Sequence, residues 1–120
     1  MAVLSQLSQI PLAVFLKEFK HLVQTEGLNM VNRLENQQFL ADLGLTKENR
    51  KDLILSLTIQ DYCSGPEADK DQPGEIWVFG KEVGSQEVYI KLKIAEIGSM
   101  KIAKCISFHA ARHPLNYPNK

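Results

Sequence analysis

Four side chains in the C-terminal part of the chain have the types and spacing for acid–base chemistry on a negatively charged substrate. Tyr89, Lys91 and Lys93 alternate with aliphatic residues between positions 88 and 94, which is the two-residue period of a strand with one buried face. His109 ends a later strand and falls on its polar side in the same way. The set combines proton-transferring groups with positive charge and has no carboxylate, which favours phosphodiester chemistry on a polyanion.

RNA is a polyanion that such groups can cut without a metal. A base removes the proton of a 2′-hydroxyl, a cation stabilises the charge on the phosphorane, and an acid protonates the leaving 5′-oxygen. Tyr89 and His109 are the candidates for proton transfer, and Lys91, Lys81 or Lys93 would supply the cation. The alternative is an ordinary solvent-exposed sheet face, on which tyrosine and lysine are common.

Trp77 and Lys81 alternate with Ile76 and Val78 in the strand before Tyr89. If the aliphatic pair faces the core, Trp77 and Lys81 lie beside Tyr89 on the polar face. An exposed indole there would stack on a base, whereas a tryptophan is more commonly part of a core or covers a sheet edge.

Three strands joined by two hairpin turns are predicted to position these residues. The strands span 74–81, 87–94 and 101–109, and the turns span 83–86 and 96–99. In the last strand the alternation groups Ile106 with Phe108 as the buried pair and separates them from Cys105 and His109.

The first half of the chain is predicted to be mainly helical. Apolar periodicity, caps and glycine stops predict helices from Pro11 to Gly27, at 36–43 and at 47–57, and a short edge strand at 28–33. Thr46 is expected to cap the third helix, and Thr58 with Asp61 a further short turn. Residues 64–74 are predicted to form an irregular loop, and the tail after Ala110 to lie over one edge of the sheet.

Length and composition indicate one ordinary domain covering residues 1–120. The chain has 44% hydrophobic and 23% charged residues, which excludes disordered and collagen-like classes. Its apolar N-terminal run is broken by polar residues and Pro11 and lacks a basic start, so we expect neither a signal peptide nor a membrane span. We therefore expect a cytoplasmic protein in which Cys63 and Cys105 are reduced thiols.

The formal net charge is zero, but the charges are unevenly distributed. Residues 1–73 hold seven Lys or Arg and ten Asp or Glu, whereas residues 74–120 hold seven and four. The positive excess therefore lies on the predicted strands, as expected for a polyanion-binding face. The acidic residues Glu67, Asp69 and Asp71 lack the ligand spacing of a calcium loop, so no metal or other cofactor is expected.

The order and spacing of several stretches resemble one family. The stretches are FLADLGLTKENRKDLILSLTIQDYCSGPEADKDQPGEIWVFGKE at residues 39–82, EVYIKLKI at 87–94 and CISFH at 105–109. Together they are similar to the motility quorum-sensing regulator (MqsR) family, which are toxins of type II toxin–antitoxin systems. The likeness extends from about Phe15 to His109.

This resemblance implies a RelE-like α+β fold, with N-terminal helices packed on a small antiparallel β-sheet. It also implies a metal-independent endoribonuclease that cleaves mRNA, arrests growth and is neutralised by a cognate antitoxin protein. Tyr89 matches the family tyrosine in the V-Y-[IL]-K strand, and His109 stands where the best-known member has a lysine in S-F-K. We therefore assign proton transfer to Tyr89 and His109, and phosphate binding to Lys81 and Lys91.

Two positions depart from the family pattern. Ser64 stands near the family lysine that follows D-[FY]-[YC], and Val78 replaces a polar residue after I-W. The remaining candidates for RNA contact or for the missing charge are Trp77, Lys93, Lys70 and Lys81. Two rival interpretations remain, namely a non-catalytic module that binds RNA or a protein through the same face, and an inactive toxin remnant that still binds its antitoxin.

Overall fold

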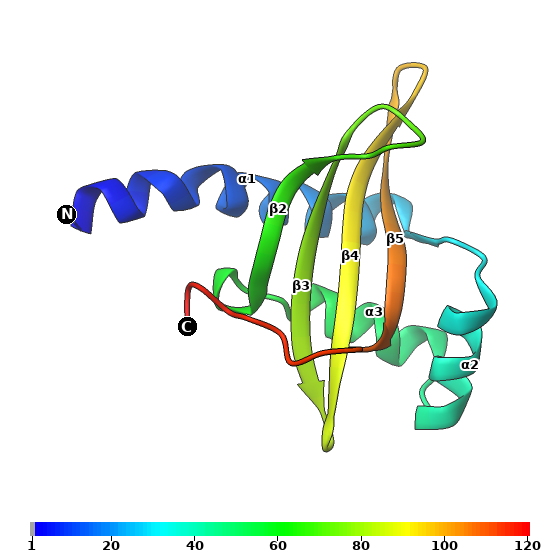
Figure 1. Cartoon of the computed structure of the whole chain (residues 1–120). Coiled ribbons are helices and arrows are strands. Elements are labelled where there is room, and N and C mark those ends of the chain that lie inside the picture. Colours follow the sequence, from blue (N-terminus) through cyan, green and yellow to red (C-terminus); the bar gives the residue numbers. More distant parts are fainter. Residues whose placement is uncertain (1) are drawn as a thin grey trace.

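A five-stranded sheet with helices behind one face forms the fold (Figure 1). The structure, a computed structural model, describes the backbone of residues 2–120 and the side chains of residues 9–120. In chain order its elements are α1 (Ala2–Glu26), β1 (Leu28–Met30), α2 (Leu34–Leu43), α3 (Lys47–Leu55), the 3₁₀ turn η1 (Ile59–Asp61), β2 (Tyr62–Ala68), β3 (Glu75–Val83), β4 (Gln86–Ile97) and β5 (Met100–Ala110).

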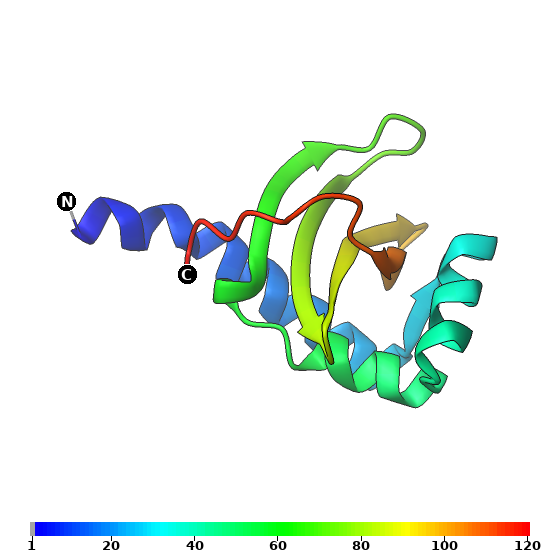
Figure 2. The same cartoon turned by 60° about the horizontal axis from the view of Figure 1, so that its bottom comes forward.

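The strand order across the sheet is β1-β5-β4-β3-β2. The pairs β2 with β3, β3 with β4 and β4 with β5 are antiparallel, whereas β1 pairs in parallel with β5 at one edge of the sheet. Helices α1 and α3 lie behind the sheet and α2 lies beside β5 (Figures 1 and 2). The predicted α+β class, with helices packed on a small antiparallel sheet, is confirmed, and β1 adds a parallel edge strand.

Each of the two hairpin turns contains a glycine. Val83 lies opposite Gln86 in the first hairpin, as predicted, while the second turn lies between Ile97 and Met100, one residue later than predicted. Gly84 and Gly98 both have φ of 63°, a left-handed conformation that glycine adopts without a steric penalty and that tight hairpin turns require.

The helices differ from the predicted ones mainly at their ends. Helix α1 begins at Ala2, so the prediction that Pro11 is its first residue is wrong. Proline lacks one backbone donor, and the surrounding helix-forming residues continue the helix through it. The predicted cap of α3 is confirmed, because Thr46 and Asn49 exchange side-chain hydrogen bonds with each other's backbone amides. No helix within residues 2–120 is long and apolar enough to cross a membrane.

Strand β2 occupies half of the segment that was expected to be a loop. It runs from Tyr62 to Ala68 and pairs with β3 through two register shifts. Pro66 lacks a backbone donor, but an edge strand pairs on one side only and tolerates both proline and bulges. The loop prediction is therefore wrong for 64–68, where local composition is overridden by pairing with β3.

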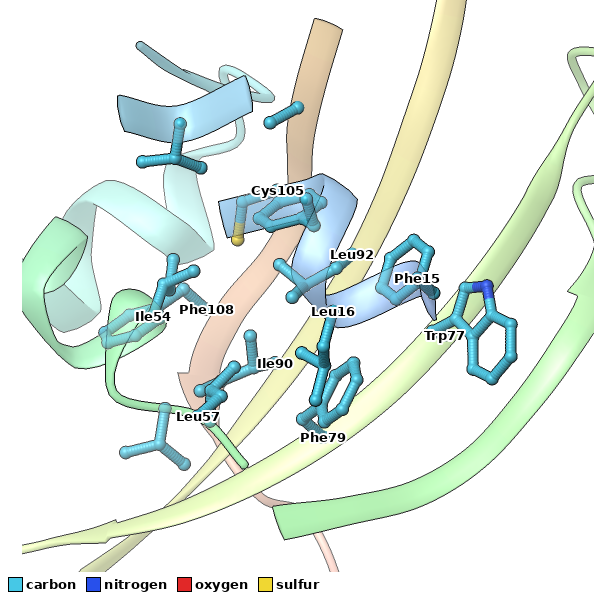
Figure 3. Close-up of a cluster of buried hydrophobic side chains, with 14 of the residues drawn as sticks. Phe15, Leu16, Ile54, Leu57, Trp77, Phe79, Ile90, Leu92, Cys105 and Phe108 are labelled. Atoms are coloured by element: carbon cyan, nitrogen blue, oxygen red, sulfur yellow. The ribbon is translucent and has the colours of Figure 1, made fainter. Parts of the chain in front are cut away.

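The core lies between the sheet and α1 and α3. Directly opposite residues of an antiparallel pair point to the same face, and Trp77 lies opposite the buried Leu92. Phe15 of α1 stacks on Trp77 with 4.9 Å between the ring centroids (Figure 3). The expectation that Trp77 lies beside Tyr89 is therefore wrong. Both alternating sets of β3 are apolar at this point, so alternation alone does not show which set faces the helices.

A β-bulge at Ile106 interrupts the alternation of β5. Lys91 lies opposite Ser107, and the next residue, Leu92, lies opposite Cys105, so Ile106 is the extra residue. Cys105 enters the core, while Ile106 lines a hollow with Lys91 on the opposite face. The predicted faces of Cys105 and Ile106 are wrong because the extra residue breaks the two-residue period.

Asn36 docks α2 onto β5. Its Nδ2 donates to the carbonyl oxygen of Ile106 at 3.0 Å, and its Oδ1 accepts from the amide of Phe108 at 3.0 Å. The side-chain amide thus replaces a neighbouring strand where β1 has ended, at a residue that is only 2% exposed. The first turn of α2 is consequently held against the edge of β5.

We expect Asn36→Ala to lower the free energy of unfolding by about 2–3 kcal/mol, because it leaves a buried carbonyl and a buried amide without partners. Urea unfolding followed by circular dichroism measures this loss. The exposed neighbour Gln37 provides the control, and Gln37→Ala should change the free energy by less than about 0.5 kcal/mol. Equal effects of the two substitutions would contradict this role for Asn36.

A buried ion pair fastens the loop between β2 and β3 to the sheet. Nζ of Lys93 lies 2.6 Å from Oδ2 of Asp69, and the lysine is 1% exposed. Gly74 passes directly over it, since a Cβ at Gly74 would lie 2.8 Å from Cε of Lys93. Lys93 therefore faces the predicted side of β4, but the loop covers its charge.

This ion pair predicts an acid-sensitive loop. The hydrogen bond from Lys93, followed by the Asp71 amide, lowers the pKa of Asp69 from 3.8 to about 2. A depressed carboxyl pKa contributes stability that is fully present above pH 4 and is lost as the pH falls toward 2. The stability difference between wild type and Asp69→Asn should therefore be constant above pH 5 and shrink between pH 4 and 2 in urea titrations. A difference that does not depend on pH would contradict the pairing, and Asp71→Asn is the matched control.

Candidate active site on the outer sheet face

We define the outer face as the sheet surface turned away from α1 and α3. Two rows of side chains cross its centre, since residues opposite each other share a face. One row consists of Gly80, Tyr89 and His109. The next row consists of Ser64, Val78, Lys91 and Ser107. The outer face thus brings three of the predicted site residues, Tyr89, His109 and Lys91, into adjacent rows.

Tyr89 and His109 form the closest functional pair on this face. Their rings are stacked with 5.3 Å between centroids and 25° between planes. Both line a pocket of about 210 Å³ whose other walls come from the C-terminal tail, at Arg112, His113 and Leu115. A phenol and an imidazole therefore meet at the edge of a small open pocket, as proton transfer to and from one substrate requires.

Lys91 provides positive charge next to this pair. Its Nζ lies 5.9 Å from the centre of the Tyr89 ring. Lys91 also lines a hollow of about 430 Å³ together with Arg33, Lys70 and Lys104. Within residues 9–120 no ion pair engages these four cations. The predicted RNA-contacting residue Lys70 is exposed at the rim of this hollow.

Lys81 is not brought to the outer face. It lies opposite the buried Val88, and its Nζ is 3.5 Å from Oδ2 of Asp61. Lys81 therefore lies on the helix-covered side of β3, as Trp77 does. Its predicted position beside Tyr89 is wrong because the alternation in β3 does not show which set of residues faces the helices. Trp77 acts in packing, and Lys93 is on the correct face but is covered and paired.

The C-terminal tail crosses the outer face from the end of β5 toward β2, beyond the edge position that was expected for it (Figures 1 and 2). Glu87 fastens it, accepting hydrogen bonds from the Leu115 amide and the Tyr117 hydroxyl, each at 2.9 Å. Gly80 lets the tail approach, because a Cβ there would lie 2.5 Å from the Tyr117 hydroxyl oxygen. The tail thereby closes one end of the Tyr89 and His109 pocket.

The environment of Tyr89 keeps its phenol protonated. Partial burial, followed by the nearby carboxylate of Glu67, raises its pKa above 10.0. At neutral pH Tyr89 is therefore a proton donor and not a base. Between the two stacked rings, the imidazole of His109 is left as the group that accepts a proton.

The cysteines take no part in this chemistry. Both are free thiols, as predicted. Burial is the main cause that raises the pKa of Cys63 to about 11 and that of Cys105 to about 12, so neither is a thiolate near pH 7. Within residues 9–120 no group of three or more His, Cys, Asp or Glu side chains is placed to hold a metal ion.

A family model described as motility quorum-sensing regulator, toxin of MqsA, matches residues 13–110. The chain belongs to this family. The match runs from α1 to the last residue of β5, so it contains the whole sheet and leaves residues 111–120 outside. No significant match was found among curated proteins or among solved structures.

The two departures from the MqsR pattern lie together beside the candidate site. Ser64 is directly opposite Val78, and Val78 is directly opposite Lys91. In the row next to Tyr89, Ser64 thus stands near the place of a lysine and Val78 in the place of a polar residue, and Lys91 is the cation in that row.

Four residues around the site are not among the candidates predicted from the sequence. Arg33 and Lys104 border the hollow beside Lys91, while Glu35 and Arg112 lie next to His109. Glu35 and Arg112 are 77 residues apart, so no local pattern connects them. Lys104 precedes the bulge, so counting every second residue back from His109 would place it on the wrong face of the sheet.

Proposed function

We propose that this MqsR-family toxin is an endoribonuclease that cleaves mRNA through the 2′-hydroxyl and thereby arrests growth. The observation that carries the proposal is the stacked Tyr89 and His109 pair at the edge of an open pocket, with Lys91 in the adjacent row. Membership of a toxin family supports the same reading. The toxin would act in the cytoplasm, where mRNA is found.

In the proposed reaction His109 accepts the proton of the 2′-hydroxyl. The 2′-oxygen then attacks phosphorus, the bond from phosphorus to the 5′-oxygen breaks, and Tyr89 protonates the departing 5′-oxygen. The products are a 2′,3′-cyclic phosphate and a 5′-hydroxyl, and the proton on His109 returns through water to Tyr89. Lys91 stabilises the extra negative charge on the phosphorane oxygens.

RNA affinity would come from the cations that border the hollow on the outer face. Lys91, Arg33, Lys70 and Lys104 are free of ion pairs within residues 9–120. Phosphate contacts of this kind make binding steeply salt-dependent. The hollow is also lined by Glu67, Asp69 and Asp71, of which Asp69 is paired with Lys93. The net charge of zero for the whole chain is compatible with RNA binding, because cations outnumber anions in residues 74–120.

We further propose that a cognate antitoxin protein neutralises the toxin, in keeping with the family description as toxin of MqsA. Inducing the chain alone in a bacterial host, and then together with the gene next to its own, tests both parts of the proposal. Arrest that the neighbouring product relieves is the expected result. Growth at the normal rate with the folded protein present would contradict the toxin function, and tight RNA binding with the RNA intact would favour a non-catalytic module.

A further inference from the structure

Glu35 in the first turn of α2 reaches the imidazole of His109 from beside the sheet. Its Oε1 lies 3.5 Å from Nδ1 of His109. The same ring nitrogen lies 2.9 Å from the carbonyl oxygen of Ala110. A carboxylate and a carbonyl accept hydrogen bonds and donate none, so Nδ1 carries the proton and Nε2 is the free nitrogen.

Two independent contacts hold Glu35 at this point. The adjacent Asn36 fixes the first turn of α2 to the backbone of β5 through buried hydrogen bonds. On the other side, Nη2 of Arg112 donates to both carboxylate oxygens of Glu35, at 2.8 and 2.9 Å. The carboxylate is therefore oriented from both the helix and the tail.

We propose that Glu35 is a positioning residue for His109 and that Arg112 supports it through their ion pair. The inference rests on the proposed function of His109 as the base. Glu35 maintains the tautomer whose Nε2 accepts the 2′-hydroxyl proton, and its negative charge stabilises the imidazolium that results. The lysine that the best-known family member has at this position has no tautomer to maintain, so a carboxylate in this role is needed only with the histidine of this chain. Arg112, which supports Glu35, lies outside the residues 13–110 that match the family.

The charged surroundings of His109 agree with this role. The groups that face it are Tyr89 of β4, Glu35 of α2, and Arg112 and His113 of the tail. Glu35 is the anion among them. The side chains of Glu35 and Arg112 are 47% and 68% exposed, and an exposed ion pair contributes only about 0–1 kcal/mol to folding. Variants of this pair should therefore remain folded.

The first test measures RNA cleavage and the His109 tautomer in parallel. Long-range ¹H–¹⁵N spectra of the wild type should show His109 with the proton on Nδ1, with His21→Gln and His113→Gln assigning the other two histidines. Glu35→Gln keeps the size of the side chain and removes its charge. It should lower kcat on the order of 10-fold with KM changed by less than about twofold, because proton transfer and not binding is affected.

The second test exchanges the two charges. The double variant Glu35→Arg with Arg112→Glu retains an ion pair between α2 and the tail but places a donor beside Nδ1. If Glu35 positions His109, cleavage stays low and the Nε2-protonated tautomer gains population. Restoration of cleavage by the exchange would show that any ion pair suffices and would overturn the proposal.

The spectra keep the inference separate from the proposed function. A wild type with the proton on Nε2, or full cleavage by Glu35→Gln, would each overturn the positioning role even if RNA is cleaved. The wild type could instead show the Nδ1 tautomer, and the charge-exchange variant its loss, while neither cleaves any RNA. That result would support the positioning role of Glu35 and contradict the proposed endoribonuclease activity.

Discussion

Replacement of His109 by alanine is expected to lower RNA cleavage by about 10²–10⁴-fold, the range contributed by one positioned acid or base. The imidazole is the group left to accept a proton beside Tyr89, whose raised pKa keeps the phenol protonated. Cleavage of a short synthetic RNA under single-turnover conditions measures this effect. His109 is only 7% exposed, although it lies outside the hydrophobic core. The urea unfolding transition of the variant must therefore match that of the wild type before the loss is assigned to chemistry.

His109→Lys is the informative companion of this variant, since the resemblance gives the best-known family member a lysine there. An amine ordinarily loses its proton near pH 10, so an amine that acts as the base should restore activity mainly at alkaline pH. Equal activity of His109→Ala and the wild type, with both folded, would remove His109 from the mechanism.

Substitutions at two consecutive residues of β4 should separate chemistry from folding. Tyr89→Phe keeps the ring stacked on His109 and removes only the hydroxyl, so we expect cleavage to fall by about 10²-fold with a stability change below about 1 kcal/mol. Ile90→Asp places a carboxylate among core side chains at a site that is 0% exposed. The substitution loses about 2–5 kcal/mol of packing free energy and also places an unpaired charge in the core. The two losses together approach the whole free energy of unfolding of a small domain.

We therefore expect Ile90→Asp to be largely unfolded at 25 °C, as circular dichroism and the loss of the urea transition would show. RNA cleavage and growth arrest should both be absent in Ile90→Asp because the protein is unfolded. A folded Ile90→Asp, or a Tyr89→Phe that unfolds, would mean that the faces of β4 are assigned the wrong way round.

The fold was predictable where one pattern dominated. In β4 aliphatic residues alternate with polar ones, and the burial of Val88, Ile90 and Leu92 follows that alternation. In β3 both alternating sets are apolar between Ile76 and Phe79, so the sequence does not indicate that Trp77 stacks on Phe15. Tertiary packing decides such a strand, because the helices cover one face only.

Part of the site was predictable for the same reason. Tyr89, Lys91 and His109 lie at equivalent phases of regular strands, and the register brings them together. Glu35 and Arg112 come from a helix and a tail, so only the folded chain shows their contact with His109. The bulge at Ile106 shows the same limit, because one inserted residue reverses the face of every residue on one side of it.

The ends of the RNA product are the measurement on which the proposed mechanism depends. Purified toxin, incubated with a defined RNA in the presence of EDTA, should release fragments with a 2′,3′-cyclic phosphate and a 5′-hydroxyl. A single 2′-deoxynucleotide at the cleaved position should prevent that cut, because the attacking oxygen is then missing. Fragments with 5′-phosphate ends, or a cut that persists at the 2′-deoxy position, would contradict attack by the 2′-hydroxyl.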